Sequence, residues 1–252
     1  MKSEKLLRII SDRPLPGAMN MAIDESILQA VNENLSPATL RFYQWDEPTI
    51  SLGYFQKYDD FVIQDEVIRN MPVLRRQTGG GAILHDDELT YSLVLPLNSI
   101  NTLTNIESMY QLVHNACQAA LKRFGIDTQY RGGRDRGNSQ RGPFFCFARQ
   151  HRLDLVVGED KILGSAQRRI SKAVLQHGSL ILTRHFAQQP SGEANRAADK
   201  AIDLNLLIEH ISLDIARQLG LEPVKKPLSE TEQGRQKQLQ EKYNSSDWNH
   251  QR

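Results

Sequence analysis

The sequence has 252 residues, of which 39% are hydrophobic and 24% charged, the composition of a soluble globular protein long enough to bury its own core. Because 31 Lys and Arg face 30 Asp and Glu, the net charge of +1 argues against a general nucleic-acid binder. We see no apolar run of the ~18–20 residues that a membrane span needs, no signal peptide and only two cysteines, so we expect a reduced, cytoplasmic protein with no membrane partner.

Apolar residues that recur at steps of three and four predict three helices. The first begins after Pro16, the second spans residues 106–124, and the third spans 203–220, with glycines at 125 and 220 as stop signals. Strand-like segments lie at residues 39–43, 49–52, 73–75, 89–97, 153–157, 162–167 and 174–182. The last three are joined by turns too short for parallel crossovers, so we predict an α+β fold with a mixed, largely antiparallel β-sheet flanked by helices.

The C-terminal part of the chain differs in composition from the rest. No repeat or Pro- or Ser-rich linker divides the chain, so residues 1–221 are predicted to form one domain. From about Glu222 the sequence becomes polar. We interpret residues 222–252 as a peripheral segment, packed on that domain or trailing from it, with one exposed helix that ends near Tyr243 and Trp248.

The most informative segment is residues 75–86, which read RRQTGGGAILHD between two predicted strands. Each glycine costs roughly 1 kcal/mol relative to alanine in a helix, but glycines let a backbone approach a ligand and expose N–H groups to an anion or carbonyl oxygen. The two arginines before them suit a carboxylate or a phosphate, while a glycine hairpin with solvated arginines is the structural alternative. The sequence that follows excludes a P-loop and disfavours a dinucleotide fingerprint.

This segment resembles the signature of the superfamily of lipoate–protein ligases, octanoyltransferases and biotin–protein ligases. Other stretches agree with that family in its order along the chain. They are the first helix at residues 20–25, the strand pair at 45–53, the second active-site segment at 161–167, its continuation at 176–180, and the C-terminal signature at 242–249. The resemblance implies that residues 1–221 form the family's class II synthetase-like catalytic domain, a mixed β-sheet flanked by helices.

Two chemistries occur in this family. Its ligases use ATP to make lipoyl-adenylate, whereas its octanoyltransferases take octanoyl from acyl carrier protein through a cysteine thioester. The ligases typically continue with Gly-Asn after the motif that ends at Asp86, but residues 87–92 here read DELTYS and resemble the LipM type of octanoyltransferase. That type carries its nucleophilic cysteine before the lysine segment. Cys146 occupies this place, fifteen residues before Lys161.

The residues around Cys146 agree with a reactive thiol. Six arginines and one acid lie between residues 131 and 152, and positive charge favours the thiolate of a group whose ordinary pKa is ~8.5. The alternative is that Cys146, placed between phenylalanines, is a small buried hydrophobe. Cys117 lies on the apolar stripe of the second predicted helix and is expected only to pack.

The resemblance further implies a set of site residues. The catalytic pair is Cys146 and Lys161, although Lys161 as a surface lysine of a hairpin is the alternative. The substrate-binding residues are Arg75, Arg76, Thr78, Gly79, Gly80, Gly81, His85, Gly164, Ser165 and Ala166. His177 fits either the site or a satisfied position in the core. No metal and no cofactor are expected; ATP and Mg would be needed only by a ligase.

The expected function is therefore transfer of octanoyl from octanoyl-acyl carrier protein, through a cysteine thioester, to a lysine of the glycine-cleavage H protein or another lipoyl domain. Three alternatives stay open: an ATP-dependent lipoate–protein ligase, an amidotransferase between lipoyl domains, and a binding module without catalysis. The arginines of residues 131–152 suit an acidic carrier protein with its phosphate, or a solvated loop. Nucleic acid is disfavoured because no aromatic residues alternate with them.

Overall fold

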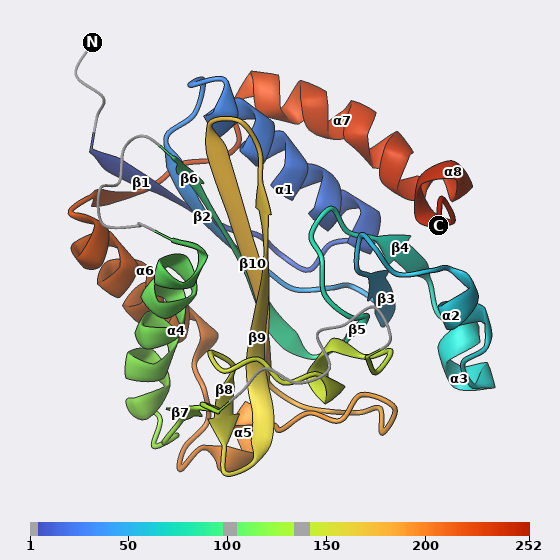
Figure 1. Cartoon of the computed structure of the whole chain (residues 1–252). Coiled ribbons are helices and arrows are strands. Elements are labelled where there is room, and N and C mark those ends of the chain that lie inside the picture. The colour runs from blue at the N-terminus through green and yellow to red at the C-terminus, as the bar shows by residue number, and fades with distance from the viewer. Residues whose placement is uncertain (1–4, 98–104, 134–141) are drawn as a thin grey trace.

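The computed structural model describes residues 5–97, 105–133 and 142–252, which build a large and a small β-sheet surrounded by helices (Figure 1). The large sheet has eight strands in the order β11-β1-β2-β6-β10-β9-β8-β7. Its strands are β1 (Leu6–Ser11), β2 (Ala38–Tyr43), β6 (Glu88–Pro96), β7 (Gln129–Tyr130), β8 (Leu155–Val157), β9 (Asp160–Arg169), β10 (Ala173–Ile181) and β11 (Glu222–Lys225). In these residues β1 runs parallel to β2 and β11, and the other pairs are antiparallel, which confirms the predicted sheet.

The small sheet holds the glycine segment. Its order is β4 (Val73–Arg75), β3 (Thr49–Leu52) and β5 (Ile83–His85), and residues 76–82 connect β4 to β5. Two short helices, α2 (Asp59–Val62) and α3 (Glu66–Arg69), follow β3. The prediction that the three glycines lie between two strands is therefore confirmed.

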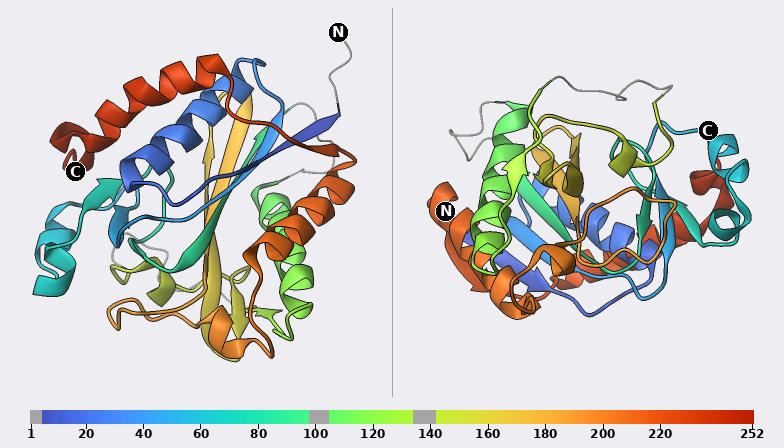
Figure 2. Two further views of the ribbon diagram at one scale, coloured as in Figure 1. Left: turned by 180° about the vertical axis from the view of Figure 1, so that it is seen from behind. Right: turned by 90° about the horizontal axis from the view of Figure 1, so that it is seen from below.

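Helices cover both faces of the large sheet (Figure 2). On one face lies α1 (Gly17–Asn32), with α7 (Glu230–Asn244) packed along it. The other face is covered by α4 (Ile106–Lys122) and α6 (Leu204–Leu219), whose apolar stripes bury the main core against the sheet. The three predicted helices are confirmed. The remaining short elements are α5 (Ala194–Ala197), α8 (Ser246–Asn249) and the 3₁₀ helix η1 (Cys146–Ala148).

The C-terminal segment corrects the expectation of one exposed helix. The strand β11 extends the sheet beside β1, and α7 buries Tyr243 and Glu232. The guanidinium of Arg8 donates to both carboxylate oxygens of Glu232, at 2.7 and 2.5 Å. Because this helix is held by hydrogen-bonded polar side chains as well as apolar ones, its polar sequence hid the buried face. Among the described residues, no helix is both long and apolar enough to span a membrane.

Candidate active site

The loop that carries Cys146 pairs with the end of the glycine segment. The Cys146 N–H donates to the Ala82 carbonyl at 2.7 Å, and the Ala82 N–H donates to the Phe144 carbonyl at 2.8 Å. Gly81 permits this approach, because a Cβ at that position would lie 2.9 Å from the Cys146 nitrogen. The fold thus brings together two segments that are far apart in the sequence.

Cys146 lies at the junction of two cavities. One is a narrow pocket between the large sheet and the small one, lined by the side chains of Met21, Tyr43, Trp45, Ile83 and Phe147 among others. The other is a more open cleft, lined by Gly79, Gly80, Ile106, Tyr110, Arg149 and Lys161 among others. Cys146, Ser165 and Ala166 line both. We call these cavities the inner pocket and the opening.

The two cysteines lie in different environments. Cys146 is half-buried at the start of η1, and the Gly80 backbone lies beside its sulfur. Cys117 is buried in the core between α4 and the sheet, and burial raises the pKa of its thiol to about 12. Cys117 is therefore held as a neutral thiol at physiological pH, whereas Cys146 is accessible from a cavity.

Lys161, on β9, lies next to Cys146 and is buried. Its Nζ donates to the Cys146 carbonyl oxygen at 3.3 Å and forms an ion pair with Asp154 Oδ2 at 2.9 Å. The lysine side chain crosses Gly164, where a Cβ would lie only 2.5 Å from Cε and 2.8 Å from Nζ. Gly164 thus makes room for the lysine. Asp154 was not identified from the sequence, and no local motif singles it out.

Arg76 is a buried arginine bound only to neutral oxygens. Its guanidinium makes five hydrogen bonds, to the hydroxyls of Thr78 and Ser51 and to the carbonyls of Ser51, Gly79 and Gly81. Burial lowers its pKa to about 10, opposed by the charge that Cys146 carries when ionised. Arg76 thereby fixes the glycine segment and places an unmatched positive charge beside the inner pocket.

Arg75 points elsewhere. Its guanidinium donates to the carbonyl oxygens of Asn249, Gly53, Tyr54 and Gln56. Asn249 in turn accepts from the Arg75 N–H at 2.8 Å. The two neighbouring arginines, which the sequence analysis treats alike, therefore have separate positions: Arg75 joins α8 to the small sheet, and Arg76 lines the inner pocket.

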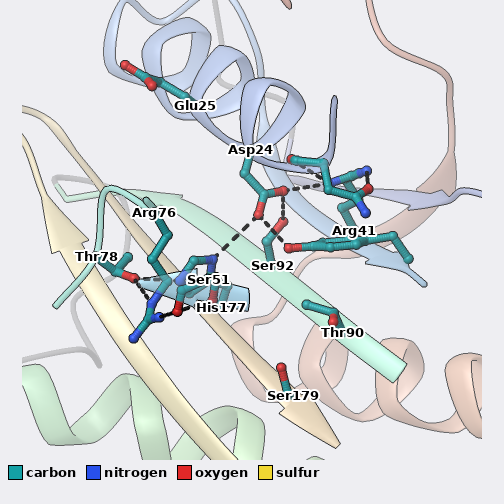
Figure 3. Close-up of polar contacts among 12 residues, drawn as sticks. Asp24, Glu25, Arg41, Ser51, Arg76, Thr78, Thr90, Ser92, His177 and Ser179 are labelled. Carbon is teal, nitrogen blue, oxygen red and sulfur yellow. Dashed lines mark hydrogen bonds and ion pairs between the residues drawn. The ribbon is translucent and has the colours of Figure 1, made fainter. Parts of the chain in front are cut away.

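A chain of polar contacts links α1 to the glycine segment (Figure 3). Thr78 Oγ1 lies 2.6 Å from His177 Nε2, and His177 Nδ1 lies 3.6 Å from Asp24 Oδ2. Burial alone would raise the pKa of Asp24, but Arg41, His177 and Ser92 together hold it below its ordinary value. His177 lines the inner pocket, so the structure gives it a place at the site and identifies Asp24 as its partner.

His85 lies on the wall of the inner pocket and is stacked on Trp45, with ring centroids 3.7 Å apart. Its Nδ1 is hydrogen-bonded to Glu88 at 2.8 Å and its Nε2 to Ser51 Oγ at 2.7 Å. Burial lowers the pKa of His85, although Glu88 opposes the shift. The ring is thus a fixed part of the wall.

Ser165, on the same strand as Lys161, belongs to a second polar cluster. Its hydroxyl lies 2.6 Å from the Tyr91 hydroxyl and 2.7 Å from His114 Nε2, while His114 Nδ1 bonds the Leu153 carbonyl at 2.6 Å. Burial lowers the pKa of His114 to about 4, so the ring is neutral at pH 7. Tyr91 and His114 could not be identified from the sequence, because they lie among apolar residues on an otherwise buried strand and helix.

The predicted arginine-rich loop lies mostly outside the described residues, since Arg134, Arg136 and Arg141 fall in residues 134–141. Of the others, Arg131 donates to the Glu159 carbonyl at 2.9 Å, Arg149 lines the opening, and Arg152 pairs with Glu107. Within the described ranges, no group of three or more His, Cys, Asp or Glu residues is arranged to hold a metal ion.

Comparison with known proteins gives consistent matches. The family of the lipoyl protein ligase A/B catalytic domain matches residues 16–200. The chain is similar to octanoyltransferase LipM of Moorella thermoacetica, with 34% identity covering 91% of this chain and 92% of that protein. It is also similar to octanoyltransferase LipM of Clostridioides difficile, with 32% identity covering 97% of this chain and 98% of that protein.

Solved structures share the fold. A lipoate-protein ligase A bound with ATP superposes with a TM-score of 0.77 at 23% identity, covering 98% of each chain. A chain from the structural analysis of a bi-partite lipoate protein ligase and its E2 lipoyl domain from Thermoplasma acidophilum gives a TM-score of 0.72 at 20% identity, covering 97% of this chain and 96% of that one. These similarities confirm the predicted α+β architecture.

Proposed function

The chain belongs to the lipoyl protein ligase A/B catalytic domain family, and from that premise we propose that it is an octanoyltransferase that acts through a thioester on Cys146. The octanoyl group is transferred to a lysine of a lipoyl-type domain. The observation that carries this proposal is the position of Cys146, a half-buried thiol at the junction of the inner pocket and the opening, next to Lys161.

The inner pocket suits an acyl chain. Its wall includes apolar side chains from both sheets, and the polar side chains of Ser51, His85, Thr90 and His177 on it are hydrogen-bonded within the protein. Burying an alkyl chain contributes ~0.8 kcal/mol per CH₂, so eight carbons gain several kcal/mol and a preference for length. The acyl carbon of a chain in this pocket then lies toward Cys146, and its carrier lies in the opening.

Two cationic side chains, those of Arg76 and Lys161, lie beside Cys146. Arg76 has no carboxylate partner in the described residues, and the Lys161 ammonium lies 3.3 Å from the Cys146 carbonyl oxygen. The thiolate attacks the carrier thioester, a sulfur–carbon bond forms at Cys146, and the carrier's carbon–sulfur bond breaks. The departing thiolate takes a proton from Lys161. Backbone N–H groups of residues 79–81 or near Gly164 are the candidates to bind the oxyanion.

The second half of the reaction reverses the proton transfer. A neutral lysine amine of the acceptor attacks the Cys146 thioester, the new amide forms, and Cys146 leaves as a thiolate. Lys161, neutral after the first step, takes the proton that the amine loses. Asp154 keeps the lysine close to Cys146 in both steps, because its carboxylate lies 2.9 Å from Nζ.

The proposed partners follow from this chemistry. The acceptor is a lipoyl-type domain such as the glycine-cleavage H protein, and the donor is octanoyl-acyl carrier protein. No cofactor is required, because the thioester already carries the activated acyl group. Adenylation by ATP would be needed only if the free acid were the donor.

Intact mass tests the proposal. The purified protein is incubated with octanoyl-carrier protein without ATP, beside the variants Cys146→Ala and Cys117→Ala. We expect an octanoyl adduct on the wild type and on Cys117→Ala but none on Cys146→Ala. No adduct on the wild type rejects the proposal. Lipoate- and ATP-dependent labelling of an acceptor that survives Cys146→Ala would instead select the ligase, and preference for an octanoylated lipoyl domain as donor would select the amidotransferase.

A further inference from the structure

Two aromatic residues, the half-buried Tyr54 and the exposed Phe55, lie beside the opening that leads to Cys146. Phe55 follows β3, and its ring lies 3.8 Å from where a Cβ on Gly79 would be, while Gly79 itself lines the opening. The rings of Tyr54 and Phe55 contact each other edge to face, with centroids 5.0 Å apart. Phe55 is 61% exposed, so its ring faces solvent at the entrance and adds little to the core.

Two arginines hold this aromatic pair. The guanidinium of Arg168, at the end of β9, lies 5.5 Å from the centre of the Tyr54 ring, and that of Arg252 lies 4.9 Å from the same ring. Arg252 also lies 5.5 Å from the Phe55 ring. We call Tyr54, Phe55, Arg168 and Arg252 the arginine rim.

In the described part of the chain, the two arginines of the rim have no carboxylate partner. No carboxylate among the residues that the structure describes forms an ion pair with Arg168 or Arg252, whereas Arg152, at another point near the opening, pairs with Glu107. Cation–π contact orients a guanidinium without cancelling its charge. The rim therefore presents two positive charges beside the opening, from the exposed Arg252 and the half-buried Arg168.

The lining of the opening also includes an exposed apolar side chain. Ile106, the first residue of α4, lines the opening and is 55% exposed. Protein-docking surfaces combine exposed aromatic and aliphatic side chains with arginines, and complementary charge steers the partner into place. Any partner that delivers a thioester to Cys146 through this opening must lie against these residues.

We propose that the arginine rim docks the acidic carrier domain that delivers the acyl group, with carboxylates of that domain paired to Arg168 and Arg252 and an apolar residue of it against Phe55. This inference rests on the proposed function and specifies its partner surface. The rim lies beside the inner pocket's entrance and not in it, so it governs carrier binding and leaves the chemistry at Cys146 unchanged.

The test measures single-turnover acylation of Cys146 against donor concentration, with octanoyl-carrier protein and with octanoyl-pantetheine, which lacks both domain and phosphate. For the double variant Arg168→Ala/Arg252→Ala we expect the half-saturating carrier concentration to rise roughly tenfold with an unchanged maximal rate. Acylation by octanoyl-pantetheine should not change. The difference in half-saturating carrier concentration between the wild type and the double variant should also become smaller as the salt concentration is raised.

Arg169→Ala is the matched control, because Arg169 is exposed on the same strand and successive side chains of a strand point to opposite faces. An equal loss in Arg169→Ala, or a loss that also appears with octanoyl-pantetheine, overturns the inference. A full loss with octanoyl-phosphopantetheine alone assigns the rim to the phosphate and also overturns it. If the carrier protein acylates the double variant as well as it acylates the wild type, the inference is overturned while the proposed function stands. If the wild type is acylated by neither donor, the proposed function itself fails.

Discussion

Buried arginines on the α1 side of the sheet have carboxylate partners, whereas the buried arginine at the inner pocket has none among the described residues. Arg8 is matched by Glu232, and Arg41 by Asp12 and Asp24 at 2.6 and 2.8 Å. Burial would lower the pKa of Arg41, but the carboxylates raise it above its ordinary value, whereas burial lowers the pKa of Arg76 to about 10. Arg76 is therefore a charge that gains from a nearby anion.

The difference separates residues that hold the fold from those that serve the reaction. A buried arginine that is matched by carboxylates, as Arg8 and Arg41 are, gains little from a further anion. An arginine bound only to carbonyls and hydroxyls is stabilised further when a thiolate or an oxyanion forms beside it. We interpret Arg8 and Arg41 as structural and Arg76 as part of the site, and the following variants test that division.

The largest expected effect is on stability, at Arg8. Replacing it with Met leaves Glu232 buried without its partner, and breaking a buried pair costs roughly 3–5 kcal/mol. Urea denaturation should show this loss, while the molecules that remain folded should acylate Cys146 at the wild-type rate. A loss of acylation with normal stability would show that the α1 side is not merely structural.

The next effect is on rate, at Lys161. Lys161→Met removes the group proposed to give and take the proton, so single-turnover acylation should fall by ~10²–10³-fold. Asp154→Asn should reduce the acylation rate by a smaller factor, since Lys161 remains. Both variants should still bind donor. If Lys161→Met transfers octanoyl at the wild-type rate, the proton role assigned to Lys161 is wrong.

A pH effect is expected at His114. Its pKa is about 4 in the folded protein and ~6.5 when unfolded, so the unfolded chain binds more protons between these values. The free energy of unfolding should thus fall as pH drops from about 6.5 toward 4, by up to about 3 kcal/mol. His114→Gln should reduce this slope in denaturant titrations at several pH values. An unchanged slope would contradict a buried neutral ring.

The smallest effect is expected for Arg76→Lys, which keeps a positive charge but loses the fork that binds Gly79 and Gly81. Acylation should slow roughly tenfold, with a smaller loss of stability than at Arg8. Alkylation of Cys146 by iodoacetamide gives an independent readout. If the variant is alkylated and acylated as fast as the wild type, Arg76 has no role in the reaction at Cys146.

The local elements could be predicted from the sequence because their signals are local. The glycine that was expected to stop the third helix follows α6 with a φ of 63°, and the structure adds Asn105 and Asp203 as the N-caps of α4 and α6. The strands β1 and β11 were not predicted, because local signals do not identify them: the edge strand β11 pairs only with β1, more than two hundred residues earlier in the chain. The buried side of α7 was hidden for the same reason.

The site divides in a similar way. Cys146, Lys161 and the glycine segment were identified through resemblance, and the structure places them together. Arg75 and Arg76 point in different directions because each side chain finds different partners after folding. Two adjacent arginines in a sequence do not reveal those partners. Asp154, Asp24 and Tyr91 could not be identified because their partners are brought next to them only when the sheet forms.

The central claim is that Cys146 holds an octanoyl group that can be passed on. It is tested most directly by isolating the protein after incubation with octanoyl-carrier protein, removing the donor, and adding a lipoyl-domain acceptor without ATP. The account predicts that octanoyl leaves Cys146 and reaches the acceptor lysine as a stable amide, as followed by the masses of both proteins. An octanoyl group that stays on the protein, or transfer that begins only when ATP is supplied, would contradict it.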